Sequence, residues 1–280
     1  MSEERFHRQE LLFGKEGQAL LETADVAIVG VGGLGSHVAQ QLAYLGVRSF
    51  RLIDPDRVEM SNLNRLVGAV ESDGIEARPK VDVIERTIRT IQPRAAIRKF
   101  AMKLVSADGF AAVQGATWVF GCLDNDAARL ILNELCQAYE LPYFDLATEI
   151  DPSTGAFGGR VVYASGAVCM HCKGLLDQAS LQRAFATEGE KAEEERIYGI
   201  ERGTLGGSGP AVVSLNGVLA SVAVTEFLVE VTGIRSAHRF LEYRGGRLFG
   251  DSSGPNFACY YCKEVRGKRK DANLERWISG

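Results

Sequence analysis

The feature of this 280-residue sequence that most limits its possible folds is a pair of Cys-x-x-Cys motifs. They place Cys169 with Cys172 and Cys259 with Cys262, and 86 residues lie between the two motifs. Thiols in the cytosol stay reduced, so pairs at this spacing are interpreted as metal ligands rather than disulfides. Four thiolates suit a closed, tetrahedral Zn²⁺ site with no open position for catalysis. The motifs therefore predict a structural zinc ion that ties the end of the chain back to residue 172. Two buried cysteine pairs, or one thioredoxin-like redox pair, are the alternatives.

The rest of the composition favours a soluble, intracellular protein. Cys122 and Cys136 have no near cysteine neighbour and lie in apolar patterns, so we expect both in the core. No apolar leader follows Met1 and no window of about 18 uninterrupted apolar residues occurs, so we expect a cytoplasmic protein without a membrane segment. The formal net charge of −4 argues against nucleic acid as a partner. The basic run 263–269 is interpreted as a solvated tail.

The first half of the chain alternates between strand and helix patterns. A continuous apolar run over 26–30, a glycine-rich turn, a helix over 36–45 and a strand over 50–54 complete one βαβ unit. An amphipathic helix over 6–21, with Gly14 and Gly17 as candidate break points, precedes this unit. Further strands are expected at 97–102, 118–122 and 142–146, alternating with helices at 81–91 and 127–139. The alternation predicts an α/β, doubly wound, Rossmann-like sheet whose first half is parallel.

The pattern changes after Pro152, where a mixed or antiparallel second half is expected. Residues 159–164 alternate like an antiparallel strand, and 239–249 indicate a β-hairpin around Gly245-Gly246. Between them lie a polar stretch over 187–196, interpreted as a solvated face, and an apolar helix over 208–231. We expect one domain over 1–280, divided into a helical arm 1–24, a nucleotide-binding half 25–150, a second half 151–262 that contains a crossover segment 173–207 and the zinc site, and a basic tail 263–280.

The glycine-rich turn predicts a nucleotide site. Gly30-Val31-Gly32-Gly33-Leu34-Gly35 matches G-x-G-x-x-G between a strand and a helix, where glycines admit a phosphate close to the backbone and the helix N-terminus offers N–H groups. Asp54, at the end of the next strand, is placed to accept hydrogen bonds from a ribose. Taken alone, these residues predict NAD.

Three charged side chains beyond the turn favour a triphosphate instead. Arg65 and Lys80 add two cations to a loop that already suffices for a pyrophosphate. Asp124 follows the strand at 118–122, where a carboxylate can hold Mg²⁺ on phosphate oxygens. The alternatives are that Arg65 and Lys80 are surface charges and that Asp124 or Asn125 caps the next helix.

With these motifs together, the sequence resembles the ThiF/MoeB/HesA adenylyltransferases, the family of the ubiquitin-activating enzymes. The resemblance implies a single adenylation domain with a Rossmann-like fold, usually a homodimer, that uses ATP and Mg²⁺ and carries structural Zn²⁺. It implies adenylation of the C-terminal glycine carboxylate of a ubiquitin-like or sulfur-carrier protein, or of a peptide. The residues that carry the resemblance are Arg8-Gln9, Gly30 to Gly35, Asp54 with Asp56, Ser61-Asn62-Leu63-Asn64-Arg65, Lys80, Asp124-Asn125 and both cysteine pairs.

The resemblance also implies roles for single residues. The expected catalytic residues are Arg65, Lys80 and Asp124, together with Arg8, which would reach into the ATP site of the other subunit. Asp54 would hold the ribose, Asn62, Arg65 and Lys80 the phosphates, and Asp124 the magnesium. The expected nucleotide-binding set is Gly30, Gly32, Gly33, Gly35, Asp54, Asp56, Asn62, Asn64, Arg65, Lys80, Asp124 and Asn125.

One departure from the family pattern limits the expected chemistry. Thioester-forming relatives carry a nucleophilic cysteine after the first zinc pair, whereas residues 173–256 contain none. We therefore expect a chain that stops at the acyl-adenylate and passes the acyl group to a sulfur donor, an amine or a second protein. An NAD-dependent oxidoreductase and a nucleotide-binding scaffold subunit are the competing hypotheses.

Overall fold

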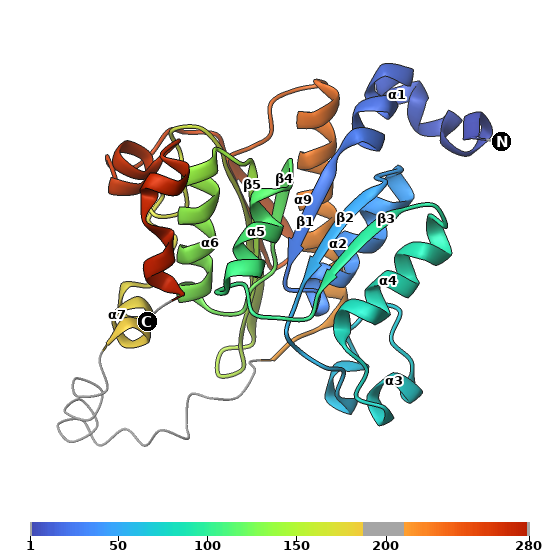
Figure 1. Cartoon of the computed structure of the whole chain (residues 1–280), viewed down its shortest axis with the longest axis horizontal. Coiled ribbons are helices and arrows are strands. Elements are labelled where there is room, and N and C mark those ends of the chain that lie inside the picture. Colours follow the sequence, from blue (N-terminus) through green and yellow to red (C-terminus); the bar gives the residue numbers. More distant parts are fainter. Residues whose placement is uncertain (1, 187–209, 279–280) are drawn as a thin grey trace.

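A computed structural model describes residues 2–186 and 210–278 of the chain (Figure 1). In this part the strands form one eight-stranded sheet in the order β3-β2-β1-β4-β5-β6-β7-β8. Neighbours from β3 to β5 run parallel, and β5 to β8 run antiparallel, which confirms the predicted fold class. The strands are β1 (Asp25–Val29), β2 (Ser49–Ile53), β3 (Ala96–Phe100), β4 (Trp118–Gly121), β5 (Tyr143–Asp151), β6 (Ala156–Ala164), β7 (Phe240–Arg244) and β8 (Arg247–Asp251).

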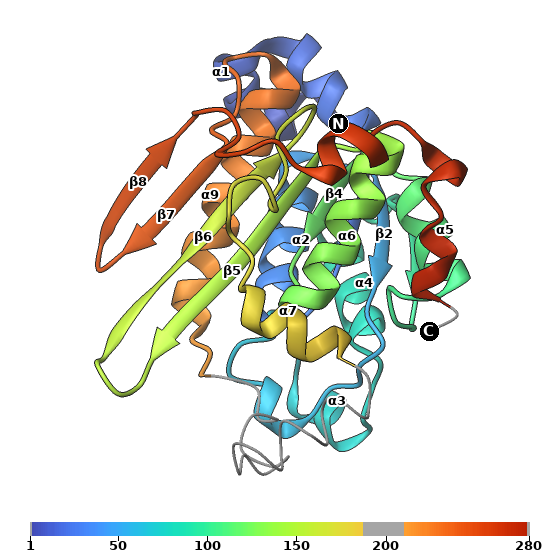
Figure 2. The ribbon, with the colours of Figure 1, turned by 90° about the vertical axis from the view of Figure 1, so that its left-hand side faces the viewer.

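Helices cover both faces of the parallel half (Figures 1 and 2). On one face α2 (Gly33–Leu45), α4 (Lys80–Ile91) and α9 (Val213–Thr232) pack around one hydrophobic core. On the other face α5 (Ala107–Gln114), α6 (Asp126–Tyr139) and α7 (Gln178–Phe185) pack around a second core. Successive residues of β1 point to opposite faces and are buried on both, which explains its continuous apolar run.

The strand order places a topological switch point between β1 and β4. The chain leaves β1 toward β2 and β3 on one side, and returns to lay β4 on the other. Val29 at the end of β1 pairs with Gly121 at the end of β4, so the loops that follow these two strands lie side by side. In open α/β sheets, ligands bind outside the carboxyl ends of strands at such a point.

The antiparallel half matches the predicted hairpin. β7 and β8 are joined by Gly245 and Gly246, whose φ angles of +52° and +89° are the left-handed values that such a tight turn requires. α9 is, among the described residues, the one helix long and apolar enough to cross a bilayer, and half of that stretch is buried. It packs against α2, β5 and β6, as the core helix of a globular domain does.

The N-terminal arm differs from the expected amphipathic helix. α1 (Ser2–Thr23) is interrupted at Gly14, at φ +73° and ψ 173°, as one of the two candidate break points predicted, whereas Gly17 lies within continuous helix. Phe6 is buried, but Leu11 and Leu12 are 76% and 68% exposed. Leu20 is exposed as well, so the arm buries some of its apolar side chains, such as Phe6 and Leu21, and presents others to its surroundings.

Several element boundaries were predicted incompletely. α2 begins at Gly33, inside the glycine loop, because residues 33–35 already have helical geometry. The predicted start of the apolar helix, 208–209, lies outside the described residues, as do the whole polar stretch 187–196 and most of the crossover segment 173–207. The helix α9 begins at Val213. The short helix α3 (Glu71–Ile75), α5 and α7 were not predicted.

The C-terminal tail is anchored, which corrects the expectation of a solvated tail. The charged side chains of 263–269 are exposed as expected. Val265, Ala272 and Leu274, however, are buried in the core that α6 also lines. The tail forms three short helical turns, η2 (Tyr261–Val265), η3 (Arg269–Ala272) and η4 (Leu274–Trp277).

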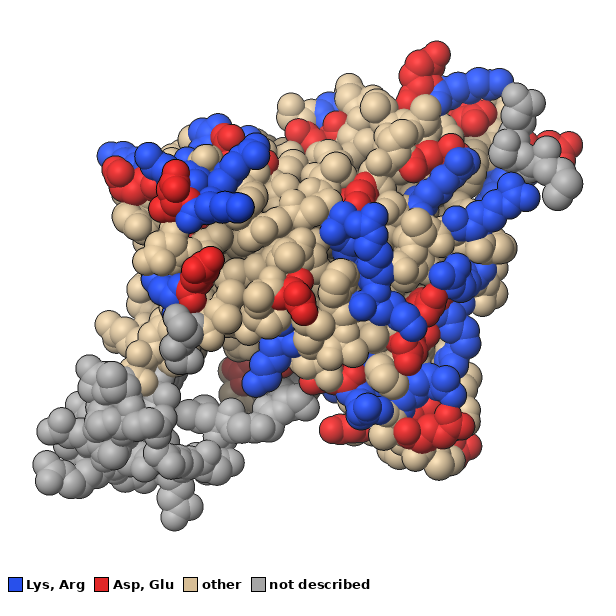
Figure 3. Space-filling view, in the orientation of Figure 1, with Lys and Arg blue, Asp and Glu red and all other residues tan. Residues whose placement is uncertain are grey.

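Charges of both signs are mixed over the face seen in Figure 3. Acidic side chains thus lie among the basic ones on this face. Ion pairs also join β3 to α4, where Lys99 contacts Asp82 and Glu85 at 2.7 Å each.

Candidate functional site

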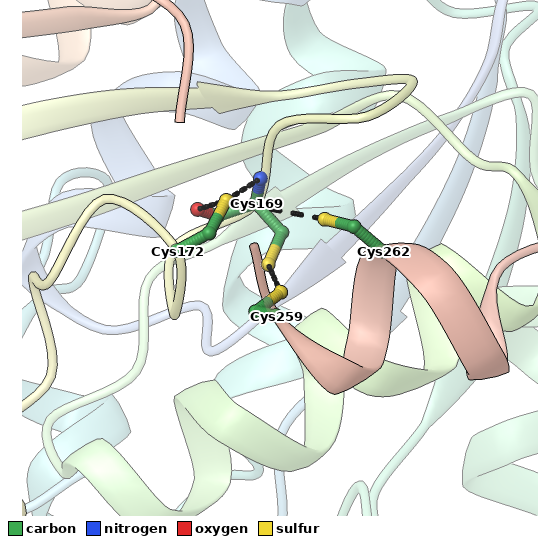
Figure 4. A group of neighbouring side chains, drawn as sticks. All are labelled: Cys169, Cys172, Cys259 and Cys262. Carbon is green, nitrogen blue, oxygen red and sulfur yellow. Dashed lines mark hydrogen bonds between the residues drawn. The ribbon is translucent and has the colours of Figure 1, made fainter. Parts of the chain in front are cut away.

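The four cysteines of the two motifs form one cluster (Figure 4). All four Sγ atoms lie within 4.8 Å of one another, with Cys169 3.6 Å from Cys259 and Cys172 3.9 Å from Cys262. Bonds of about 2.3 Å in a tetrahedron place sulfur atoms about 3.8 Å apart, so the cluster has the dimensions of a zinc site with four thiolate ligands. Burial raises the pKa of Cys169 to about 12, and a bound divalent cation would stabilise its thiolate.

The surroundings of the cluster indicate a structural role. Asn133 of α6 accepts a hydrogen bond from the Met170 backbone N–H at 3.1 Å, which fixes the first motif to α6. Lys173 is buried and donates to Asp251 and Ser253 at 2.9 Å each, which fixes it to the end of β8 and to the loop that follows. The cluster thus joins three parts of the fold that are far apart in sequence.

The glycine loop is shaped by contacts that exclude side chains. Gly30 has φ +86°, and a Cβ there would lie 2.6 Å from the Cys122 carbonyl oxygen. A Cβ at Gly35 would overlap the carbonyl of Gly30, and one at Gly33 would overlap the Asn216 side chain of α9. Gly32 alone of these four faces open space, with nothing within 4 Å of its Cβ position. The loop therefore presents bare backbone at the N-terminus of α2, which fits a phosphate group.

The Asp54 carboxylate binds backbone N–H groups of this loop and of the segment after β2. Its Oδ2 accepts from the Val31 N–H and its Oδ1 from the Asp56 N–H, both at 2.8 Å. Burial raises the pKa of Asp54. A carboxylate has about four acceptor positions, so the two backbone bonds leave room for the ribose contact that the sequence predicts.

Two cations lie at the same edge of the sheet. Arg65 packs beside the loop, with its Cδ 3.6 Å from the Cβ position of Gly33, and donates to the Ser61 carbonyl at 2.6 Å and to Asn64 at 3.1 Å. Lys80 Nζ lies 2.7 Å from Asp56 Oδ2. Both cations are therefore oriented by neighbours from the predicted motif.

Two of the predicted nucleotide ligands have structural contacts of their own. Asn62 is buried, and its Oδ1 accepts from the Glu59 N–H at 3.2 Å within a short turn. Asn125 Oδ1 accepts from the Ala128 N–H at 2.8 Å and so caps α6. Asp124 and Asn125 were the two residues considered as caps of the next helix. Asn125 caps it and Asp124 does not. Contacts of Asn62 and Asn125 with nucleotide remain predictions.

Asp124 is exposed beside the glycine loop. In residues 2–186 and 210–278 its side chain makes one hydrogen bond, accepted from Asn125 Nδ2 at 3.1 Å. The Cys122 carbonyl lies against Gly30 of the glycine loop. Asp124 follows Cys122 by two residues in the sequence. A carboxylate with free acceptor positions at this place fits a Mg²⁺ ligand on phosphate oxygens.

A buried charge pair supports the loop of Asp124 and was not predicted. Arg129 of α6 donates to the Leu123 carbonyl, to Asp145 and, at 3.1 Å, to the Leu146 carbonyl. The Tyr143 hydroxyl donates to Asp145 at 2.6 Å, so the buried carboxylate has a partner on each oxygen. The sequence signal for this network was an arginine on the apolar side of a predicted helix.

Arg8 lies far from the glycine loop of its own chain. Its neighbour Gln9 donates to the Leu45 carbonyl at 2.9 Å, at the C-terminal end of α2. The loop is at the other end of this 13-residue helix, about 20 Å away.

The two remaining cysteines are packed as predicted. Cys136 is buried in the second core and Cys122 packs against the first. Burial raises the pKa of both thiols, so neither is disposed to form a thiolate nucleophile.

The family model for the ThiF family matches residues 6–253, nearly the whole chain. The chain belongs to the ThiF family. This confirms the resemblance predicted from the motifs and disfavours the oxidoreductase alternative.

Several curated relatives of this ThiF-family chain are named as adenylyltransferases. The sulfur carrier protein ThiS adenylyltransferase of Bacillus subtilis is 32% identical over 176 residues, which are 62% of this chain and 50% of that protein. The molybdopterin-synthase adenylyltransferase of Escherichia coli is 34% identical over 171 residues, 60% of this chain and 66% of that protein. The chain thus spans between half and two thirds of the length of these relatives.

Solved structures share the fold. The E. coli enzyme MccB bound to ATP superposes with a TM-score of 0.69 at 19% identity, over 92% of this chain and 74% of that one. PaaA superposes with a TM-score of 0.66 at 22% identity, over 91% and 83% of the two chains.

Proposed function

We propose that this chain uses ATP and Mg²⁺ in the cytoplasm to adenylate the C-terminal carboxylate of a sulfur-carrier or ubiquitin-like protein ending in glycine, or of a peptide. The observation that carries the proposal is the convergence of bare glycine backbone, Arg65 and Asp124 at the β1/β4 switch point. The names of the relatives support the reaction type, because they act on the ThiS carrier and on molybdopterin synthase. MccB, which has the same fold, was solved in complex with N-formylated MccA.

The proposed reaction needs no protein base. An oxygen of the substrate carboxylate bonds to the α-phosphorus of ATP, the bond from that phosphorus to the bridging oxygen breaks, and pyrophosphate leaves with the electron pair. The carboxylate is already ionised at neutral pH, so no proton is transferred. The residues of the chain act by positioning and by charge neutralisation. Arg65 and Lys80 would bind phosphate oxygens. Asp124 would hold a magnesium ion that offsets the negative charge of the phosphates.

A homodimer is part of this proposal. Arg8 lies about 20 Å from the glycine loop of its own chain, too far to contact a nucleotide there. Leu11 and Leu12, on the same arm, are largely exposed and supply apolar area for a subunit contact. Two-fold pairing would allow each arm to place its Arg8 in the other subunit's site.

Arg8→Ala is expected to lose ATP–pyrophosphate exchange and to be rescued by mixing with Asp124→Ala. A mixed dimer rebuilds one intact site, so random pairing restores roughly a quarter of wild-type activity. The measurement is exchange after subunit mixing, with Arg5→Ala as control, because Arg5 is an exposed arginine on the same arm that contacts Gln92 of its own chain. If mixing restores nothing although mass spectrometry shows mixed dimers, Arg8 acts within its own chain or has no role.

The enzyme is expected to form an acyl-adenylate but no thioester. Residues 173–256 contain no cysteine, and burial raises the pKa of the thiols of Cys122 and Cys136. The chain is incubated with ATP, magnesium and an acyl substrate shown to support exchange, and then analysed by intact mass and on a non-reducing gel. A stoichiometric adduct that is lost on adding thiol would contradict this prediction, and Cys122→Ser and Cys136→Ser would locate it.

The test of the function is ATP–pyrophosphate exchange that depends on a candidate carboxylate. Small proteins ending in Gly-Gly are the first probes, and the same proteins lacking the last glycine are the matched controls. Exchange that requires the intact C-terminus supports adenylation. ATP binding without exchange for any probe would favour the scaffold subunit, and binding of NAD in preference to ATP would favour the oxidoreductase.

A further inference from the structure

The C-terminal tail makes contacts that the zinc site and the nucleotide site do not explain. The match to the ThiF family ends at residue 253, so the turns η2 to η4 lie outside it. Within the tail, Val265, Ala272 and Leu274 are buried, and Leu274 shares a core with Leu181 of α7. The tail is therefore attached to two helices, α6 and α7, at once.

The attachment to α6 runs through a buried carboxylate. Glu134 has no exposed surface, and its two oxygens accept from Arg276 Nη2 and, at 3.0 Å, from Trp277 Nε1. A buried carboxylate without partners is strongly unfavourable, so the tail supplies what this side chain of α6 needs. Arg276 also lies over the Trp277 ring, 4.7 Å from its centroid, and holds the indole in place.

The attachment to α7 runs through the same indole. The Trp277 ring contacts the ring of Phe185, the last residue of α7, with centroids 5.0 Å apart and the ring planes tilted by 38°. At the opposite end of α7 the Asp177 backbone N–H donates to Asp126 Oδ2 at 2.8 Å. Asp126 is the first residue of α6 and follows Asp124 by two positions. α7 is therefore held between the tail and the start of α6, directly after the loop that carries the predicted magnesium ligand.

We propose that the tail, residues 263–278, is a positioning element for the nucleotide site. Trp277 holds α7 against α6, and the Asp177 N–H before α7, together with Arg129, which lies 3.8 Å from Asp126 Oδ1, engages the Asp126 carboxylate and leaves Asp124 to bind the metal. The inference rests on the proposed function, because it assigns the tail a role in binding Mg·ATP. Trp277, Phe185 and Asp126 are positioning residues, because they act through Asp124 and not by touching the nucleotide.

The first test is hydrogen exchange in the full-length, zinc-loaded protein. In Trp277→Ala the amides of α7 and of 122–127 are expected to exchange about ten-fold faster, because the aromatic pair and the bond to Glu134 are both lost. Phe185→Ala breaks the same contact from α7 and is expected to have the same effect on α7. Trp277→Phe keeps the ring contact with Phe185 but loses the bond to Glu134, so it is expected to restore the protection of α7. Lys270→Ala, an exposed tail position, is the control.

The second test is the affinity for ATP measured by calorimetry with and without magnesium. Trp277→Ala is expected to weaken Mg·ATP binding about ten-fold and to leave binding of ATP without added magnesium unchanged, since only the Asp124 loop is displaced. Unaltered α7 exchange in both Trp277→Ala and Phe185→Ala overturns the inference, as does faster exchange with unaltered Mg·ATP affinity. If the wild type binds no ATP, the proposed function fails, and the exchange rates of α7 alone decide whether the tail holds that helix.

Discussion

Asp124→Ala is expected to lower ATP–pyrophosphate exchange about 100-fold or more while the protein stays folded. Asp124 is exposed, and within the described residues its side chain has a single hydrogen bond, so the fold loses little without it. The variant would lack the carboxylate that is proposed to hold Mg²⁺ at the switch point. Arg65 and Lys80 would then be the groups left to neutralise the phosphate charge. The measurement is the exchange rate at saturating ATP over a range of magnesium concentrations.

Two further variants make this result specific. Asp124→Asn keeps the shape of the side chain and removes the charge, so it is expected to lose exchange as well. Asp108→Ala removes an exposed carboxylate from the first turn of another helix, α5, and is expected to keep exchange. A near-normal rate in Asp124→Ala, with unchanged zinc content and melting temperature, would move the metal ligand to another residue.

Removal of zinc is the second large effect. The cluster is expected to bind one Zn²⁺ per chain, and Cys169→Ser or Cys262→Ser to lose it. Zinc binding contributes on the order of 10 kcal/mol in small domains that have no other core, and less is expected here because two hydrophobic cores remain. The expected result is a lower melting temperature, with the antiparallel half losing protection from hydrogen exchange before the parallel half.

The measurements are metal content by elemental analysis and thermal unfolding of each variant. Cys136→Ala is the control, because Cys136 is a buried cysteine of α6 outside the cluster, and it should keep the zinc. A wild-type protein that is fully stable without metal would refute the assignment. It would support the alternative of two packed cysteine pairs.

The sequence was sufficient to predict the parallel half and the position of the site. Apolar runs such as 26–30 identify strands buried on both faces, and the glycine loop and Asp124 follow two such strands. Which strands are neighbours could not be read from the pattern. The observed pairing of β1 with β4 is what brings Asp124 to the loop.

The roles of polar residues were harder to predict than their location. Asn62 and Asn125 belong to the predicted motif, yet both use acceptor capacity on backbone N–H groups. Asp54 was expected only to bind the ribose. Its carboxylate also accepts a hydrogen bond from the Val31 N–H and so supports the glycine loop. Short polar side chains bond either to backbone or to ligand, and a sequence motif is the same in both cases.

The anchoring of the tail was not predicted because its apolar residues are sparse. Between 263 and 278 the buried positions Val265, Ala272 and Leu274 follow no helical or strand period, since the segment is built from short turns. Glu134 is a charged residue in a helical pattern, and only its contacts with Arg276 and Trp277 reveal that it is buried. Such pairs between distant segments leave no signal in a single sequence.

The order of the strands also bears on how the chain is made on the ribosome. β6 pairs with β7, and 75 residues lie between Ala164 and Phe240. At a synthesis rate of about 5–20 residues per second, a nascent chain presents β6 as an open edge for roughly 4–15 s before its neighbour emerges. During that interval Cys169 and Cys172 hold half of a metal site. An unpaired edge strand is a template for association with other chains, so in this interval the nascent chain exposes β6 to such association.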